Sequence, residues 1–504
     1  MVAKPSHSQL MWSPHTAQAN TPWAGTRSKP AAQQQPAINI EIERHFTSKI
    51  YTSGSTISGR AIVQTLRDVP FGGFDILFTG VAATRLDFVQ QYTPHSIHPF
   101  MTLRMPILQS SLPENMVFEA GKTYSIRFNF VVPHQLTLGA CNHRCSTPGV
   151  REQHLRLPPT VGFWEADDQA PDMTQIEYSI KARAYCRREA GSFVEGYHVV
   201  NVLPTCLEDA PLDITSRDER YNLSKSKTIR KNLFTAKAGK LTATASQPAA
   251  VMLAGDGHST STTTARVCLE FAPVSAETAP PKVNSISGKI TAATFFSAAP
   301  TDLLPNLGSR SVFTANPALS YTITSRLFSN PIDKVAWQRQ NFSGRRDSGY
   351  SDLGVGKNGF RTSCSQSHSR IGGKSMGSKT CPIRDTAVLE VPFSIPMSNR
   401  KLYLPTFYSC LISRTYTLHL NLSVGPTNST MSLAIPLQIG VKTLHQSRFG
   451  PEPLIFDSGR AGYEAAEVDA YVQPRVFRMP EIARQSNSLL PGYEELSRRT
   501  IGAT

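Results

Sequence analysis

Apolar and polar residues alternate along the chain from Ile38 onward. In residues 38–42, isoleucines occupy every second position, and Asn39 and Glu41 lie between them. Successive side chains of a β-strand point to opposite faces, so this pattern predicts a strand with one buried face. The same period recurs many times, and no segment shows a sustained helical repeat. The chain is therefore predicted to be all-β.

A first block of alternating segments extends over residues 37–205. Residues 175–188 are expected to form a strand that points Ile176 and Tyr178 inward and Lys181 and Arg183 toward solvent. The other expected strands of this block are 58–64, 74–83, 123–132 and 197–204. A block of this length can bury a hydrophobic core of its own.

A second block extends over residues 263–445. Residues 414–424 and 431–441 have the most regular period-two pattern of the chain. The remaining expected strands are 265–273, 283–296, 319–328 and 388–396. Short strands separated by turns that contain Gly and Pro favour β-sandwiches, so we expect one sandwich in each block.

The segments outside these blocks have a different composition. Residues 1–36 are rich in Pro, Gln, Ser and Ala and are predicted to be a disordered tail. Residues 206–262 are interpreted as a basic linker with at most a short helix, and residues 446–504 as a C-terminal tail. A Ser-, Gly- and base-rich stretch at about 339–379 is expected to be a flexible insertion in the second sandwich.

The chain of 504 residues carries a formal net charge of +15. Such a balance suits nucleic acid, an anionic membrane or acidic protein segments as partners. Nucleic acid is disfavoured because aromatic residues are not interleaved with the basic ones. Candidate contacts with anionic lipid or acidic protein tails are Lys181, Arg183, Arg187, Arg188, Lys225, Lys227, Arg230 and Lys231. The alternative is that these side chains are simply solvated.

Two further features concern location and chemistry. The N-terminal residues lack an apolar signal-peptide core, and no stretch approaches the roughly 18–20 apolar residues of a membrane span. We therefore expect a cytoplasmic protein with reduced cysteines. A phosphate-binding loop, a Gly-x-Ser-x-Gly elbow and a His-Glu-x-x-His motif are absent from the sequence, so we do not expect an enzyme or a cofactor.

Cysteines and histidines cluster in one short segment. Cys141, His143 and Cys145, with His134 and His154 near them in sequence, are the residue types that bind zinc. A second cysteine pair at the usual spacing does not follow, so we expect a reduced surface loop and no metal site.

Several segments resemble the arrestin fold, and most closely the fungal α-arrestins, or arrestin-related trafficking adaptors. In the first block these are FEAGKTYSIRFNFVVP (118–133) and LPPTVG (157–162) followed by IEYSIKARAY (176–185). In the second block they are YLPTFYSCLISRTYTLHLNLSV (403–424) and MSLAIPLQIGV (431–441). The resemblance implies two tandem immunoglobulin-type β-sandwich domains of arrestin type. The segment 141–145 and the stretch at 339–379 depart from the family pattern.

The C-terminal tail contains LLPGYEEL at residues 489–496. In the family, Pro-Pro-x-Tyr or Leu-Pro-x-Tyr motifs bind WW domains of HECT-type ubiquitin ligases, and Leu490, Pro491, Gly492 and Tyr493 fit the second form. Proline holds the preceding residue extended, and aromatic WW grooves accept such preformed peptides. The alternative is that this segment packs on a sandwich or forms an ordinary Pro-Gly turn.

The resemblance implies a function as a non-catalytic adaptor. It would bring a HECT-type ubiquitin ligase to cytosolic segments of plasma-membrane transporters or receptors, at the plasma membrane or endosomes, and so promote their ubiquitylation and endocytosis. Ser348, after Arg345 and Arg346, is a candidate phosphorylation site whose modification would restrain the adaptor. The alternatives are an arrestin-like signalling scaffold for pH or nutrient sensing and a retromer-like sorting coat subunit.

Overall fold

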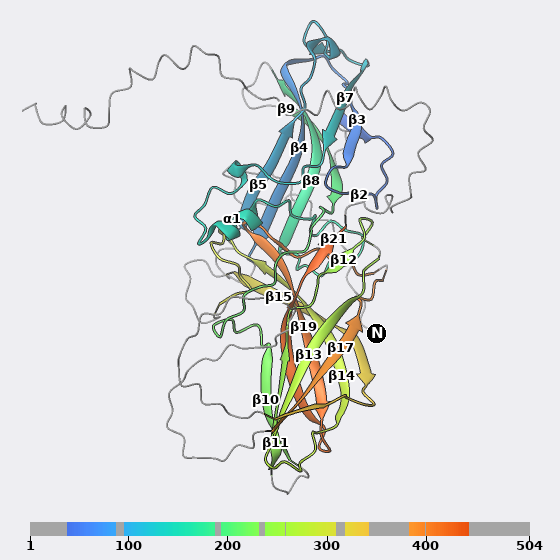
Figure 1. Ribbon diagram of the computed structural model, residues 1–504. Coiled ribbons are helices and arrows are strands. Elements are labelled where there is room, and N and C mark those ends of the chain that lie inside the picture. The colour runs from blue at the N-terminus through green and yellow to red at the C-terminus, as the bar shows by residue number, and fades with distance from the viewer. Residues whose placement is uncertain are drawn as a thin grey trace, which may run out of the picture. The chain divides into compact units, whose positions relative to one another are not determined.

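A computed structural model describes residues 38–86, 95–186, 193–230, 237–257, 259–308, 318–341, 383–398 and 400–442. Strands dominate these residues, so the all-β prediction is confirmed (Figure 1). Within the described part, the helices are α1 (Pro148–His154) and the 3-10 turns η1 (Gln109–Ser111) and η2 (Leu138–Ala140). A helix that could span a membrane is absent from the described part of the chain.

The first block contains a three-stranded antiparallel sheet in the order β1-β3-β7. Its strands are β1 (Ile38–Ile42), β3 (Thr56–Gln64) and β7 (Thr123–Val131). Every second residue of β3 is buried, as the alternation in its sequence predicts.

A larger sheet in the same block has the order β2-β9-β8-β4-β5, and β6 pairs with β4. Its strands are β2 (Ile50–Tyr51), β4 (Val69–Arg85), β5 (His95–Arg104), β6 (Val117–Phe118), β8 (Thr174–Cys186) and β9 (Phe193–Val202). The ring of Phe78 on β4 lies 5.9 Å from that of Phe130 on β7 and 6.0 Å from that of Tyr178 on β8. The two sheets therefore pack face to face in a sandwich-like arrangement.

The second block contains a five-stranded sheet in the order β10-β11-β13-β17-β16. Its strands are β10 (Ser224–Arg230), β11 (Lys237–Ala245), β13 (Thr263–Pro273), β16 (Gln338–Asn341) and β17 (Ile383–Phe393). Figure 1 shows β13 beside β17, in agreement with their antiparallel register.

The expected linker at 206–262 is wrong, because β10, β11 and β12 (Val251–Leu253) lie within it. Leu241 of β11 pairs with Phe271 of β13, and both side chains are buried. The inward positions of β11 are mostly small residues, such as Ala243 and Ala245, while Lys240 points outward. β11 therefore packs into the core of the second block, although its buried and exposed residues differ little in hydrophobicity.

A second sheet of this block has the order β15-β14-β19-β18, and β20 pairs with β19 on the same edge as β18, farther along the strand. Its strands are β14 (Val283–Phe296), β15 (Leu319–Pro331), β18 (Phe407–Tyr408), β19 (Ile412–Val424) and β20 (Ser429–Leu437). The turn between β19 and β20 has Gly425 at φ +72°, which glycine adopts without strain. β21 (Ile439–Val441) pairs in parallel with β12.

The first and second blocks contact each other through buried polar groups. Thr84 Oγ1 donates to the carbonyl oxygen of Ser297 at 2.7 Å. Gln169 Nε2 donates to the carbonyl oxygen of Leu402 at 3.2 Å. Both blocks belong to one compact unit.

The other expected segments lie mainly outside the described residues. These are the N-terminal tail at 1–36, the C-terminal tail at 446–504 and most of the insertion at 339–379. The start of that insertion is corrected, because residues 339–341 belong to β16 and pair with β17.

Candidate functional site

The tail motif and the phosphorylation site lie outside the described residues. This applies to Leu490, Pro491, Gly492, Tyr493 and Ser348, and equally to the basic residues Arg187, Arg188 and Lys231. Their roles remain predictions from the sequence.

Lys181 and Arg183 do not form the exposed basic row that the sequence predicts. Lys181 is only 7% exposed, because β8 is a central strand and its neighbours opposite Lys181 are Leu77 and Tyr197. Long side chains on neighbouring strands can cover the aliphatic stem of a lysine. Arg183 forms an ion pair with Glu195 on β9. The prediction that these two residues present free positive charge is therefore wrong.

The remaining basic candidates lie on β10, an edge strand of its sheet. Lys225 and Arg230 are exposed, and Lys227 is half-buried, with its Nζ donating to the carbonyl oxygen of Thr430 at 3.2 Å. The neighbouring strand β11 adds the exposed residues Lys237 and Lys240. We call these five residues the basic edge.

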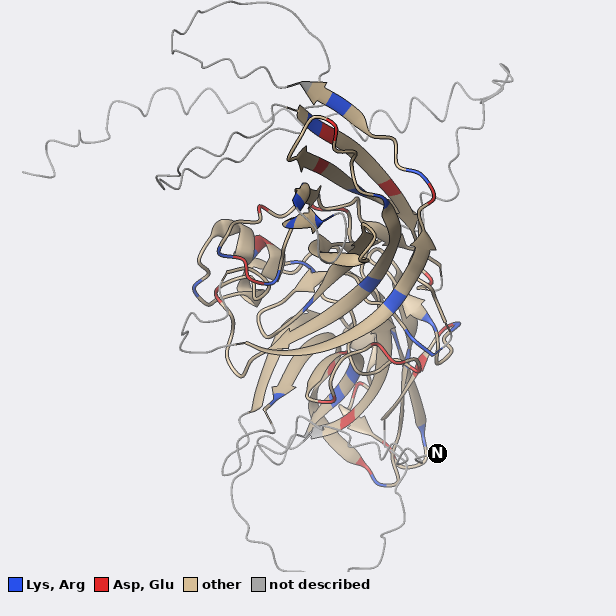
Figure 2. Cartoon of the chain, turned by 90° about the horizontal axis from the view of Figure 1, so that it is seen from below, with Lys and Arg blue, Asp and Glu red and all other residues tan. Residues whose placement is uncertain are grey.

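The basic edge carries five positive charges on two neighbouring strands. Neither β10 nor β11 contains an acidic residue. Other described strands carry residues of both signs (Figure 2), as β13 does with Arg266 and Glu270. β14 and β15 likewise carry a basic residue and no acidic one. An exposed strand edge can accept an extended peptide, and its positive charge would favour an acidic one. Lysines on an edge strand also prevent uncontrolled strand pairing, which is the purely structural interpretation.

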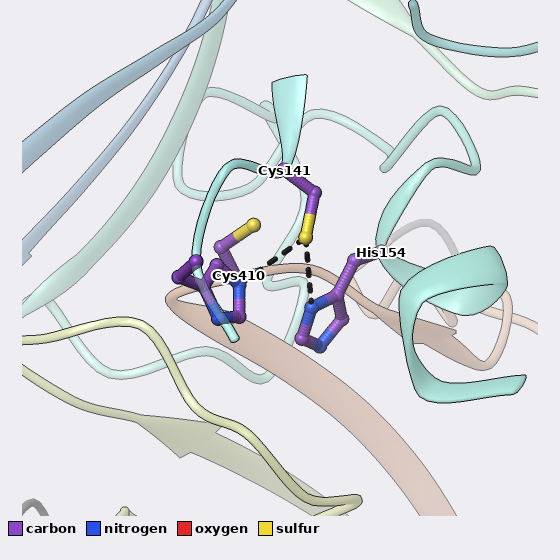
Figure 3. A group of neighbouring side chains, drawn as sticks. Cys141, His154 and Cys410 are labelled. Carbon is purple, nitrogen blue, oxygen red and sulfur yellow. Dashed lines mark hydrogen bonds between the residues drawn. The ribbon is translucent and has the colours of Figure 1, made fainter. Parts of the chain in front are cut away.

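A group of cysteine and histidine side chains gathers where the loop before α1 meets the turn between β18 and β19. The ligand atoms of Cys141, His143, His154 and Cys410 all lie within 4.8 Å of one another. Sγ of Cys141 is 3.3 Å from Nε2 of His143 and 3.7 Å from Nδ1 of His154. Figure 3 shows Cys141, His154 and Cys410 drawn together around one point.

Local structure explains how these side chains are placed. Thr147 caps α1 by accepting a bond from the backbone N–H of Val150, and Pro148 occupies its first turn. The helix ends at His154, which is buried. Cys410 lies in a turn that is closed by Ser409, whose hydroxyl donates to the carbonyl oxygen of Ile412 at 2.7 Å.

The environment of the cluster is strongly desolvated. Burial raises the pKa of the Cys145 thiol to about 11 and that of the Cys410 thiol to about 12. Burial also lowers the pKa of His154 to about 4, with a smaller contribution from His143. Low polarity disfavours thiolate and imidazolium, so without a cation the thiols of Cys145 and Cys410 and the imidazole of His154 are neutral.

The expectation of a surface loop at 141–145 is wrong for Cys141, which is fully buried. The sequence identified Cys141, His143, Cys145 and His154 as candidate ligands but missed Cys410. That residue belongs to the other block, and its only sequence signal is a cysteine inside an apolar segment.

Comparisons with known proteins do not identify a relative. No protein-family model matches this chain, and no curated protein matches it.

Proposed function

We propose that the chain is a non-catalytic adaptor of the α-arrestin type. Two tandem arrestin-like sandwiches contact cytosolic segments of a plasma-membrane transporter or receptor. The tail recruits a HECT-type ubiquitin ligase through a WW domain, and ubiquitylation then commits the membrane protein to endocytosis. Catalysis belongs to the ligase.

The observation that carries this proposal is the Leu-Pro-Gly-Tyr motif in a tail that follows the all-β body. Pro491 fixes its own φ and restricts Leu490 to extended geometry, as a WW groove requires. Tyr493 supplies an aromatic ring with a polar tip, which suits a half-apolar pocket. A single motif of this kind should bind with a Kd on the order of micromolar, about −8 kcal/mol.

The basic edge supports the other half of the proposal. Lys225, Arg230, Lys237 and Lys240 are exposed and lie on two neighbouring strands without an acidic residue. Such a surface suits acidic cytosolic segments or the anionic lipid beside them. For ubiquitylation to occur, the basic edge must contact the membrane protein or the lipid beside it while the tail binds the ligase.

A titration of the full chain with isolated WW domains tests the recruitment step. We expect Tyr493→Ala to weaken binding at least about tenfold, because an anchoring tyrosine typically contributes ~2 kcal/mol or more. The chain offers a matched control in Tyr463, which shares Gly-Tyr-Glu with the motif but lacks Leu-Pro before it. Tyr463→Ala should leave the affinity unchanged. Equal affinities for the wild type and Tyr493→Ala would exclude this mode of recruitment.

A further inference from the structure

We infer that Cys141, His143, His154 and Cys410 form a structural zinc site that joins the two blocks. Three ligands come from the segment between β7 and β8, and the fourth comes from the turn between β18 and β19. The inference does not depend on the adaptor function, so each can fail without the other.

Two of the distances between ligand atoms suit a tetrahedral zinc ion, and all four ligand atoms lie within 4.8 Å of one another. Zinc bonds of about 2.0–2.1 Å to nitrogen and about 2.3 Å to sulfur place ligand atoms roughly 3.3–3.8 Å apart. The distances from Sγ of Cys141 to His143 Nε2 and His154 Nδ1, 3.3 and 3.7 Å, fall in this range. A set of two cysteines and two histidines is a common structural zinc set.

The hydrogen bond of His143 prepares its other ring nitrogen for a metal. Nδ1 of His143 lies 3.0 Å from the carbonyl oxygen of Arg144. A carbonyl oxygen can only accept, so Nδ1 carries a proton, and in the neutral ring Nε2 is then the nitrogen with the free lone pair. Nε2 is the atom that faces Cys141, and a backbone partner on the second nitrogen is the usual arrangement for a zinc-binding histidine.

Burial indicates a structural rather than a catalytic ion. Cys141, His154 and Cys410 are buried, and His143 is half-buried. Four protein ligands complete a tetrahedral shell and leave no position for a reacting water. Two thiolates would neutralise the dication, and the ion in turn would favour the thiolate form in this desolvated place.

Cys145 lies beside the site but is not needed to complete it. Its Sγ is 3.7 Å from that of Cys141 and 3.8 Å from Nδ1 of His154. A cluster of reduced thiols and imidazoles held together by weak hydrogen bonds is the alternative to a metal site. The two interpretations differ in metal content and in the role of Cys410.

The site would fasten one block to the other. The backbone N–H of Ser146 donates to the carbonyl oxygen of Asp302 at 2.9 Å, and that of Thr301 donates to the carbonyl oxygen of Cys410 at 2.9 Å. These bonds show that the 141–154 segment and the Cys410 turn already meet through the 301–302 loop. A zinc ion would lock this junction with four stronger bonds.

Metal analysis of the purified full chain tests the inference. We expect about one zinc ion per chain in the wild type and a loss of at least about tenfold in Cys141→Ser and Cys410→Ser. Cys268→Ser is the matched control, because Cys268 lies on β13 and is not among the four proposed ligands, and it should keep its zinc. A wild-type chain that stays free of zinc after reconstitution, or a Cys410→Ser chain that keeps it, would overturn the inference.

A variant that keeps four metal ligands distinguishes the loss of a ligand from the loss of the folded structure. His143→Cys keeps four ligands and raises the number of thiolates from two to three. Reconstituted with Co²⁺, it should retain the visible bands of a tetrahedral ion and show stronger thiolate-to-cobalt charge transfer than the wild type. Charge transfer of unchanged strength would remove His143 from the ligand set and contradict the site as assigned.

Discussion

Arg414 on β19 donates through Nη1 to the backbone carbonyl oxygen of Asp168, at a distance of 2.9 Å. Its Nε donates to Oγ1 of Thr294 at 3.0 Å. Arg414 is 1% exposed, and its Nη2 has no hydrogen-bond partner among the described residues. The Asp168 carboxylate accepts from the backbone N–H groups of Gly162 and Ala170. A buried cation therefore bridges the two blocks with incomplete hydrogen bonding.

Removal of this cation should destabilise the protein. Burial raises the pKa of Asp168, and the positive charge of Arg414 is the main effect that opposes this shift. Arg414→Met would leave Asp168 and Thr294 without their buried partner, so we expect a loss of about 3 kcal/mol in the free energy of unfolding.

Arg266 provides the control, since it lies on β13 with its side chain exposed. Arg266→Met should change stability by no more than about 0.5 kcal/mol. Urea unfolding monitored by fluorescence gives both values. Similar small losses for the two variants would show that Arg414 does not hold the blocks together.

Removal of metal should lower the melting temperature of the wild type. The binding free energy of a structural ion adds to the free energy of folding, so chelation shifts unfolding to lower temperature. We expect a decrease of several degrees for the wild type in a strong chelator and no decrease for Cys410→Ser. Scanning fluorimetry with and without chelator measures the shift. An identical shift in both proteins would mean that the chelator acts elsewhere.

The strands with a regular apolar period were predictable from the sequence. Residues 283–296 form β14 with the expected bounds, because branched and aromatic side chains mark its buried face. β11 was missed since Ala238, Gly239 and Ala243 fill its inner positions and give little contrast with Lys and Thr. β10 was missed because Ile229 is its one buried residue. A short strand of small residues is recognised only when its partner, here β13, is known.

The candidate sites were less predictable than the strands. The burial of Lys181 depends on the strands that flank β8, which periodicity along one strand does not reveal. The cysteine and histidine cluster combines Cys141 with Cys410, and sequence spacing cannot show that two blocks meet at that point. The tail motif, in contrast, could be predicted from the sequence alone, because the residues that a partner recognises in a short linear peptide are consecutive.

A histidine pair in the first block should make stability depend on pH. The rings of His45 and His198 lie 4.8 Å apart, and Nδ1 of His45 is 3.1 Å from the hydroxyl of Tyr51. Burial lowers the pKa of both histidines, and His198 and Lys49 lower that of His45 further. The folded state therefore binds fewer protons than the unfolded state below about pH 6.5.

The sign of this effect follows from the lowered pKa values. Stability is fully present above the unfolded pKa and falls as the pH drops through the folded pKa. We expect the difference in unfolding free energy between about pH 7.5 and about pH 5.5 to be smaller in His198→Gln than in the wild type. Urea titrations at both pH values measure it. A larger difference in the variant would contradict the assignment.

The basic edge should bind anionic membranes. Lys225→Gln combined with Arg230→Gln removes two exposed charges from β10, and we expect about tenfold weaker binding to phosphatidylserine vesicles. Lys334→Gln removes an exposed charge from another loop and should have little effect. Cosedimentation at low and high salt quantifies the difference. If the two variants lost binding equally, net charge rather than the basic edge would be responsible.

Ubiquitylation of membrane proteins in cells tests the adaptor proposal most directly. Quantitative mapping of ubiquitin remnants in a plasma-membrane fraction would compare cells that carry the wild type, Tyr493→Ala or Tyr463→Ala. We predict that a defined set of transporters or receptors loses ubiquitin at least several-fold with Tyr493→Ala and retains it with Tyr463→Ala. Unchanged ubiquitylation in all three, with pathway signalling altered instead, would contradict the adaptor proposal and favour a scaffold.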